Sequence, residues 1–203
     1  MRHLPFRAER LLTAPERGFG PATPEEQIVY GARRPGFPLP VVSPQSVAHW
    51  LGVVDQAGIE RLLCLLPPRQ LAAYSDLLGA YRQAFGPAQV CWAPIDDFRL
   101  ASEPLLLDQI LPFLFDAAGA QERVVVHCSG GIGRTGHVLA AWLVAARGMG
   151  NAEAISAIQR AGRNPREARD PRLDALLDAA RARFAQPRPQ QGIAPLHGGD
   201  HRT

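Results

Sequence analysis

Cys128 and Arg134 stand six positions apart, on either side of a loop rich in glycine, and together they could bind and attack a phosphate group. Glycines allow the backbone to curl so that successive N–H groups converge on one point, and a helix that starts near Arg134 would add the positive end of its dipole. We therefore expect an anion site the size of a phosphate, formed by Ser129, Gly130, Gly131, Ile132, Gly133 and Arg134.

The two flanking residues have separate expected uses. The guanidinium fork of Arg134 can hold two phosphate oxygens at once, which a single-point lysine cannot reproduce. The converging amides and the helix dipole would also stabilise a thiolate at Cys128, and the thiolate is the nucleophilic form of cysteine. Cys128 is therefore the expected nucleophile.

The segment from His127 to Gly136 resembles the signature of the cysteine-based protein tyrosine phosphatases, HCxxGxxR followed by Ser or Thr and Gly, and every fixed position is present. The resemblance implies that Cys128 attacks phosphorus and that water hydrolyses the resulting phosphocysteinyl intermediate. It also implies that the Thr135 hydroxyl helps to release the cysteine, that His127 tunes the thiolate from behind, and that no metal or other cofactor takes part.

Cleavage of a phosphate monoester also needs a proton for the leaving oxygen. The segment from Trp92 to Phe98 contains Pro-Ile-Asp-Asp-Phe, which resembles the Pro-Ile-x-Asp-Phe acid loop of small atypical dual-specificity phosphatases. This alignment makes Asp97 the general acid, and later the base that activates water. Asp96 is expected to be a solvated neighbour or a loop hydrogen-bonder, although adjacent carboxylates couple and either could be the titrating group.

The elements around these segments alternate between strands and helices. Short apolar runs predict strands at 28–30, 59–66, 90–93 and 123–127. Helical spacing and capping residues predict helices at 44–57, 71–85, 102–118 with a kink at Pro112, 135–147, 151–161 and 173–184. The alternation predicts an α/β fold with a mostly parallel central sheet, helices on both faces, and a ligand site beyond the carboxyl ends of the strands.

The chain divides into three expected segments. Residues 1–24 are rich in arginine, proline and glycine and are predicted to form a flexible N-terminal segment, and the polar residues 186–203 are predicted to be a disordered tail. Residues 25–185 are the expected phosphatase catalytic domain, with the resemblance strongest from 90 to 147.

Composition excludes several classes of function. The chain has 22 basic residues against 19 acidic ones, and this net charge of +3 is too small to indicate a nucleic-acid partner. All the basic residues are arginine, so a Schiff-base lysine and the lysine of a P-loop are both absent. The longest apolar runs, 105–115 and 138–146, are about half of a bilayer span and predict core helices.

The cysteines favour a reducing compartment. Cys64, Cys91 and Cys128 are too sparse for a disulfide framework, and no secretory signal precedes them, so we expect a cytoplasmic protein. Cys64 and Cys91 lie in apolar strand segments and are expected to be buried, like Trp50, Trp92 and Trp142, which are expected core residues.

The remaining arginines are ambiguous. Arg33 and Arg34 follow the first predicted strand, where the resemblance to small phosphatases would let them reach the phosphate pocket, but we expect them to be solvated loop residues. Arginines at every third position from 160 to 172 give a small positive patch that fits substrate binding and a solvated helix end equally well.

The resemblance therefore predicts a metal-independent phosphomonoester hydrolase that acts on a phosphorylated protein, on phosphotyrosine alone or also on phosphoserine and phosphothreonine. One alternative is a phosphoinositide, inositol phosphate or RNA 5′-phosphate enzyme of the same fold. The lack of lysine in the loop disfavours the lipid substrate. A second alternative is a noncatalytic phosphate-binding module. A nucleophilic Cys128 would also be open to oxidation, which predicts loss of activity in peroxide and recovery with thiol.

Overall fold

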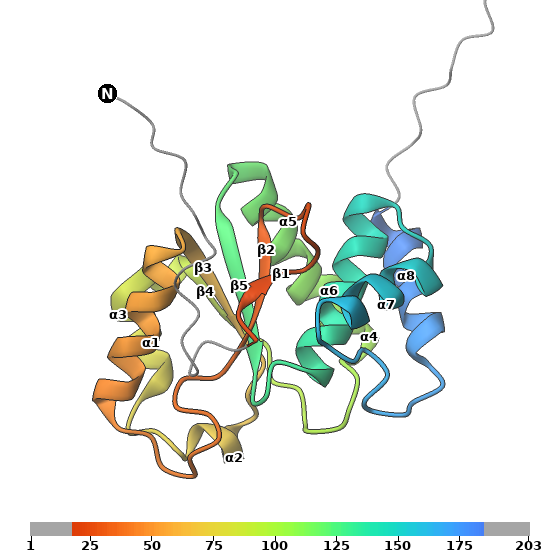
Figure 1. The fold of residues 1–203 in the computed structure, drawn as a ribbon. Coiled ribbons are helices and arrows are strands. Elements are labelled where there is room, and N and C mark those ends of the chain that lie inside the picture. The colour runs from red at the N-terminus through yellow and green to blue at the C-terminus, as the bar shows by residue number, and fades with distance from the viewer. Residues whose placement is uncertain (1–17, 185–203) are drawn as a thin grey trace, which may run out of the picture.

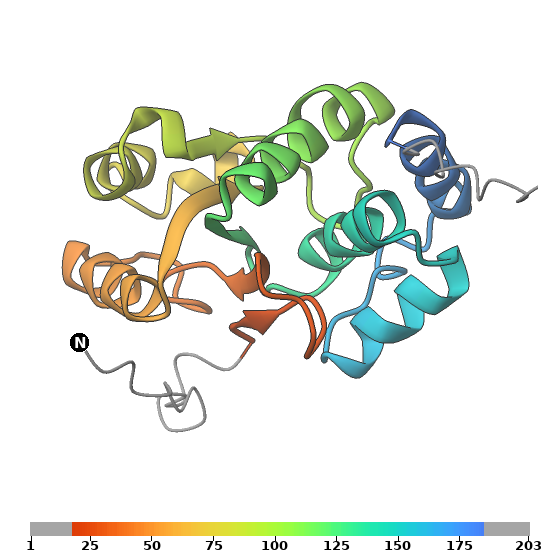
Figure 2. The ribbon, with the colours of Figure 1, turned by 90° about the horizontal axis from the view of Figure 1, so that it is seen from above.

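The computed structural model describes residues 18–184, in which a five-stranded sheet carries helices on both faces (Figures 1 and 2). The strands are β1 (Gly20–Pro21), β2 (Val29–Arg33), β3 (Ile59–Cys64), β4 (Val90–Trp92) and β5 (Arg123–Cys128). Their order across the sheet is β1-β2-β5-β3-β4, and every neighbouring pair is parallel except β1 with β2. The predicted α/β fold with a mostly parallel sheet is confirmed.

One face of the sheet is covered by α1 (Pro44–Gln56) and α3 (Leu77–Phe85), at the left of Figure 1. The Ser43 side chain accepts a hydrogen bond from the Ser46 amide and so caps the start of α1. Trp50 and Tyr81 are buried against the sheet, in a cluster that includes Val125 at the centre of β5.

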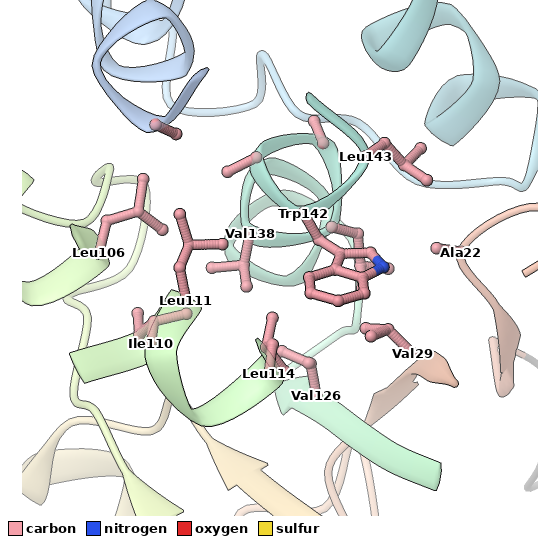
Figure 3. Close-up of a cluster of buried hydrophobic side chains, with 14 of the residues drawn as sticks. Ala22, Val29, Leu106, Ile110, Leu111, Leu114, Val126, Val138, Trp142 and Leu143 are labelled. Carbon is pink, nitrogen blue, oxygen red and sulfur yellow. The ribbon is translucent and has the colours of Figure 1, made fainter. Parts of the chain in front are cut away.

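The other face is covered by α4 (Glu103–Leu105), a π-helical turn η4 (Leu106–Ile110), α5 (Leu111–Ala120), α6 (Gly133–Arg147), α7 (Asn151–Arg160) and α8 (Leu173–Phe184). Figure 3 shows Val138 and Trp142 of α6 facing the apolar residues of η4 and α5 and the sheet residue Val126. Every residue of α6 from Gly133 to Val144 is buried, so this helix is held on all sides. A helix in that position fixes the loop that precedes it.

Two predicted helices are interrupted. The predicted helix 71–85 is split into α2 (Pro68–Leu71) and α3, because the Asp76 side chain accepts the Gly79 amide at 2.8 Å and begins a new helix. A short 3-10 turn at Pro87–Gln89 then leads into β4. In the predicted helix 102–118 the turn before Pro112 is a π turn, in which the Leu111 amide donates to the Leu106 carbonyl.

The range that we assigned to a flexible N-terminal segment includes β1, which is paired with β2. The guanidinium of Arg163 holds β1 in place, because its Nη2 donates to the carbonyls of Gly18, Gly20 and Gly31. Ala22, the residue that follows β1, is fully buried. Residues 1–17 and the predicted tail 186–203 lie outside the described residues.

A buried carboxylate joins this edge of the sheet to α6. Glu26 accepts hydrogen bonds from Trp142 Nε1 at 3.1 Å and from Nε and Nη2 of Arg147 at 2.9 and 3.0 Å. Burial alone would raise the pKa of Glu26, but the hydrogen bonds from Arg147, the Ile28 amide and Trp142 outweigh it and hold the pKa below its usual value. Glu26 is therefore ionised in the folded protein.

No helix within residues 18–184 is long and apolar enough to cross a membrane. The loops that follow β2, β3, β4 and β5 gather at the lower end of the sheet in Figure 1, where α2 also lies. This is the carboxyl edge of the parallel strands, where the ligand site of an open α/β sheet is expected.

Candidate active site

Cys128 is the last residue of the central strand β5, and α6 begins five residues later at Gly133. The cysteine is 2% exposed and lies beside Arg33 in the register of β2 with β5. Arg34, the next residue, donates its amide to the Ser129 carbonyl at 3.0 Å, which extends the pairing into the loop. The loop from 128 to 134 is thus fixed between a buried strand and a buried helix. It is called the phosphate loop below.

Two glycines allow the loop to lie against its neighbours. Gly131 has a φ of +72°, and a Cβ atom there would lie 2.6 Å from the Ala32 carbonyl oxygen of β2. A Cβ atom on Gly133 would overlap the carboxylate of Glu167. Glycine is required at both positions because a side chain would displace β2 or the segment before α8.

Arg134 is 3% exposed, and its guanidinium is held from three sides. Nη1 donates to the Gln70 side-chain oxygen at 2.8 Å and to the Ile95 carbonyl at 3.1 Å, and Nη2 lies 2.9 Å from Asp97 Oδ1. The structure therefore brings together the signature arginine and the aspartate of the predicted acid loop, which stand 37 positions apart in the chain (134 minus 97).

The acid loop makes a tight turn at this point. The Arg99 amide donates to the Asp96 carbonyl at 3.1 Å, and Phe98 adopts a φ of +56°, in the left-handed region that non-glycine residues rarely occupy. The turn directs Asp97 toward Arg134, while the side chain of Asp96 is 68% exposed and lies 3.7 Å from the exposed Arg69. Of the two adjacent aspartates, Asp97 is the one at the phosphate loop.

Gln70 is a site residue that sequence reasoning missed. Its side chain accepts from Arg134 and donates from Nε2 to Asp97 Oδ2 at 3.3 Å, so that the amide closes a ring with the other two side chains. Gln70 lies in the short helix α2 after β3. Neither a motif nor a periodic pattern marks this position, because the contacts depend on how distant loops meet.

His137, on the first turns of α6, provides a second connection to the acid loop. Its Nε2 accepts the Ala101 amide at 3.1 Å, and its other ring nitrogen bonds the Gly133 backbone. Burial lowers the pKa of His137 to about 4, so the ring is neutral at physiological pH and keeps the lone pair that Ala101 needs. Sequence reasoning did not identify this histidine as a site residue.

His127 lies behind Cys128, toward α1 and α3. Its Nδ1 is 3.3 Å from the Cys128 carbonyl, which can only accept, so Nδ1 carries the proton and Nε2 accepts from the Tyr81 hydroxyl at 3.0 Å. Burial lowers the pKa of His127 to about 4. A neutral ring, in edge contact with Trp50 and Tyr81, therefore supports the end of β5.

Thr135 follows Arg134 on α6 and is fully buried. Its hydroxyl has no hydrogen-bond partner among the described residues. Buried hydroxyls are nearly always bonded, so an unpartnered one beside the phosphate loop is available to a group that forms or binds during a reaction.

The expectation that Arg34 is solvated is wrong. Its side chain is buried and donates to the Tyr74 hydroxyl at 2.9 Å and to the Leu39 carbonyl at 2.6 Å, and its Nε lies 3.4 Å from Ser129 Oγ. Arg34 thus ties the loop after β2 to the phosphate loop. Arg33 is half-buried.

The arginines between 160 and 172 do not form one open patch. Arg163 is buried against β1, and burial lowers its pKa to about 10, which leaves it charged. Arg166 and Arg172 are paired with Asp174 at 2.9 Å and Asp170 at 2.7 Å. Most of the positive charge expected there is therefore neutralised or structural.

The other cysteines are separated from the site in different ways. Cys64 is fully buried on the α1 and α3 side of the sheet, whereas Cys128 belongs to the cluster on the α6 side. Burial raises the pKa of Cys64 to about 12. Cys91 is only half-buried, and its sulfur lies 3.5 Å from Gln109 Nε2.

Comparison with known proteins agrees with this geometry. Residues 80–174 match the family model of the dual specificity phosphatase catalytic domain. The fold is similar to that of Tk-PTP in its active form, with a TM-score of 0.59 and 23% identity over 77% of this chain and 92% of that chain.

Two further structures of similar fold contain phosphorylated ligands. PTPMT1 in complex with PI(5)P has a TM-score of 0.60 and 15% identity, over 81% of this chain and 97% of that chain. TpbA of P. aeruginosa in complex with pTyr has a TM-score of 0.53 and 19% identity, over 80% of this chain and 88% of that chain.

Within residues 18–184, no group of three or more His, Cys, Asp or Glu side chains is placed to hold a metal ion. The signature loop between β5 and α6, the match to the phosphatase domain and the shared α/β fold agree with one another. The chain therefore matches the dual specificity phosphatase catalytic domain over residues 80–174, and its fold is similar to that of solved protein tyrosine phosphatases.

Proposed function

We propose that the protein is a metal-independent phosphomonoester hydrolase that uses Cys128 as its nucleophile and acts on phosphotyrosine in proteins. The observation that carries the proposal is the meeting of two loops at the end of β5. The phosphate loop supplies Cys128 and Arg134, and the acid loop supplies Asp97, whose carboxylate lies 2.9 Å from Arg134.

In the first step, the Cys128 thiolate attacks phosphorus while the bond from phosphorus to the leaving oxygen breaks. The amides of residues 129–134 and the Arg134 guanidinium hold the phosphoryl oxygens as negative charge develops on them. Protonated Asp97 gives its proton to the leaving oxygen, so that the alcohol or phenol departs neutral. The product that stays behind is a phosphocysteine.

In the second step, water attacks phosphorus and the bond from sulfur to phosphorus breaks. Asp97, now ionised, takes a proton from that water, and inorganic phosphate leaves. The buried Thr135 hydroxyl has no other partner among the described residues and would donate a hydrogen bond to the departing thiolate. This interaction stabilises the leaving group.

An aromatic substrate is favoured by the side chains at the mouth of the loop. A Cβ atom on Gly130 would lie 3.8 Å from Phe37 Cζ and 3.9 Å from Ile132 Cδ1, so both side chains border the same part of the loop. Phe98, next to Asp97, is 63% exposed. Aromatic and aliphatic side chains around an anion site fit the ring of phosphotyrosine better than the hydroxyls of an inositol.

Hydrolysis of p-nitrophenyl phosphate in the presence of a chelator tests the chemistry. We expect activity in the wild type, none in Cys128→Ser, and a fall in kcat of about 10²–10⁴-fold in Asp97→Ala, the range for loss of a general acid. Cys91→Ser and Asp96→Ala are matched controls that should retain activity. A rapid-quench experiment should trap a phosphocysteine in the wild type.

A substrate panel then tests the substrate class. Phosphotyrosine, phosphoserine and phosphothreonine peptides, phosphoinositides and a 5′-phosphorylated RNA are compared by kcat/KM. We expect phosphotyrosine to be preferred, and preference for an inositol lipid or RNA end would overturn that assignment. A folded wild type that binds phosphate without hydrolysing any of these substrates would indicate a binding module instead.

A further inference from the structure

The exposed large apolar side chains of residues 18–184 lie in loops at the carboxyl edge of the parallel strands. Among residues 18–184, the exposed large hydrophobic residues are Phe37, Leu39, Val41, Phe98 and Ile132. The first three belong to the loop between β2 and α1, and the other two to the acid loop and the phosphate loop. Clustered exposed apolar side chains on one edge of a protein mark a binding surface.

A groove lies beside the phosphate loop, between the β2–α1 loop and the outer side of α1. It has a volume of about 680 Å³, and its apolar lining includes Phe37, Pro38, Leu39, Trp50 and Val53. Arg33 also lines it, and the lining contains no aspartate or glutamate. A groove of this size and composition is suited to an apolar side chain in a neutral or acidic segment.

Phe37 separates the groove from the phosphate site and belongs to both. Its ring lines the groove and also borders Gly130 of the phosphate loop. A molecule whose phosphate was held by Arg134 would therefore meet Phe37, and the groove, next to the phosphate loop. The two sites can be filled by adjacent parts of one substrate.

The wall of the groove is rigid. Arg34 donates to the carbonyls of Pro35 and Leu39, the Tyr74 hydroxyl donates to the Pro35 carbonyl at 2.8 Å, and the Leu39 amide donates to the Gly36 carbonyl at 2.9 Å. The exposed side chains of Phe37 and Leu39 are thus presented by a loop that is already ordered. A preformed apolar surface binds its partner without the entropic cost of ordering itself.

We propose that this groove is a docking subsite for the substrate polypeptide, in which an apolar side chain within a few residues of the phosphotyrosine packs between Leu39 and Val53. The proposal rests on the proposed function and extends it from the phosphate to the flanking sequence. The continuity through Phe37 and the absence of carboxylates in the lining favour a polypeptide that also carries acidic residues.

Paired phosphopeptides test the subsite. One peptide carries phosphotyrosine among glycine, serine and glutamate, and its partners carry leucine two, three or four residues before or after the phosphotyrosine. In the wild type we expect kcat/KM to rise about tenfold for at least one leucine position, which corresponds to partial burial of one leucine side chain.

Two variants act on the groove without touching the phosphate loop. Leu39→Ser removes an apolar wall residue that is 52% exposed, and Val53→Arg fills the groove. Both should remove the gain from leucine and leave p-nitrophenyl phosphate hydrolysis unchanged. Val41→Ser is the matched control, because Val41 is 78% exposed and lies outside the lining, and it should keep the gain. Melting temperatures confirm that each variant is folded.

Binding to the Cys128→Ser protein separates the two proposals. Fluorescence polarisation with the same labelled peptides measures affinity without turnover, so the groove is tested even if the wild type hydrolyses nothing. Equal affinity for the leucine and glycine peptides overturns the docking subsite, and hydrolysis of p-nitrophenyl phosphate would then leave the proposed function in place. A preference for phosphoinositide vesicles over every peptide would also overturn the docking subsite.

Discussion

The carboxylate of Asp97 and the guanidinium of Arg134 form an ion pair, with 2.9 Å between Oδ1 and Nη2. Arg134 is almost completely buried, whereas the side chain of Asp97 is 34% exposed. The guanidinium nitrogen that Asp97 occupies is one of those expected to hold a phosphoryl oxygen. In the proposed mechanism, the acid and the substrate phosphate would therefore compete for the same cation.

This competition predicts that removal of the carboxylate tightens the binding of inert oxyanions. In Asp97→Ala we expect the dissociation constant for tungstate to fall about tenfold, because one charged hydrogen bond to Arg134 no longer has to be broken. Isothermal titration calorimetry measures the change. Asp96→Ala should bind tungstate as the wild type does, and unchanged affinity in Asp97→Ala would show that the ion pair does not oppose anion binding.

Gln70 is expected to position both members of this pair. Gln70→Ala removes an acceptor from Arg134 and a donor to Asp97, and hydrogen bonds to charged groups predict a fall in kcat/KM of about 10–100-fold. Gln70→Glu keeps the acceptor for Arg134 but loses the donor to Asp97. The added negative charge also competes with the phosphate for Arg134, so we expect KM to rise above that of Gln70→Ala while kcat stays low.

Steady-state kinetics with p-nitrophenyl phosphate across pH resolve these two effects for Gln70. Gln83→Ala, at an exposed position on α3, is the control and should behave as the wild type. Wild-type kinetics in Gln70→Ala would exclude a positioning role.

Two buried histidines predict a loss of stability in mild acid. The pKa of His127 and of His137 is lowered by burial from 6.5 to about 4. Between these values the unfolded chain binds protons that the folded protein does not, so the free energy of unfolding is greatest above pH 6.5 and falls as the pH drops toward 4. Each histidine can contribute on the order of 3 kcal/mol.

Urea unfolding at several pH values between 7.5 and 4.5 measures this effect. In His137→Gln, the fall in the free energy of unfolding between pH 7.5 and 4.5 should be about half as large. The reason is that only one of the two buried histidines is left. A stability that stays flat from pH 7 to 5 would contradict the assignment of neutral buried rings.

Gly131 is predicted to be essential for the shape of the phosphate loop. Gly131→Ala combines a left-handed backbone with a Cβ atom 2.6 Å from the Ala32 carbonyl oxygen. We expect the substitution to lower the free energy of unfolding by about 2 kcal/mol or more and to weaken tungstate binding. Gly119→Ala is the matched control, since a Cβ atom there meets nothing within 4 Å on α5. It should stabilise the protein by about 0.5–1 kcal/mol.

Local patterns were sufficient for much of the fold and for the phosphate loop. The glycine-rich segment between Cys128 and Arg134 follows a run of valines and precedes a helix, and all three parts are contiguous in the chain. The cap at Ser43 and the alternation of strands and helices are equally local. Such features are set by neighbouring residues, so the sequence displays them directly.

Features that depend on distant segments could not be predicted in this way. Arg34, Gln70 and His137 each bond a loop that is remote in sequence, and an isolated polar residue carries no pattern that reveals its partner. The break before α3 depended on one capping aspartate, Asp76, within an otherwise helical pattern. In these cases the tertiary contact, rather than the local propensity, decides the structure.

The ties that Gln70 and His137 make to the acid loop also affect the entropy of binding. Fixing the backbone of one free residue costs roughly 1–2 kcal/mol, and an acid loop that closed only over bound substrate would take that cost from the binding energy. Here the loop is ordered when the chain folds. The binding energy of a substrate then only has to align the substrate itself. The position of Asp97 is maintained by the same contacts that stabilise the folded protein.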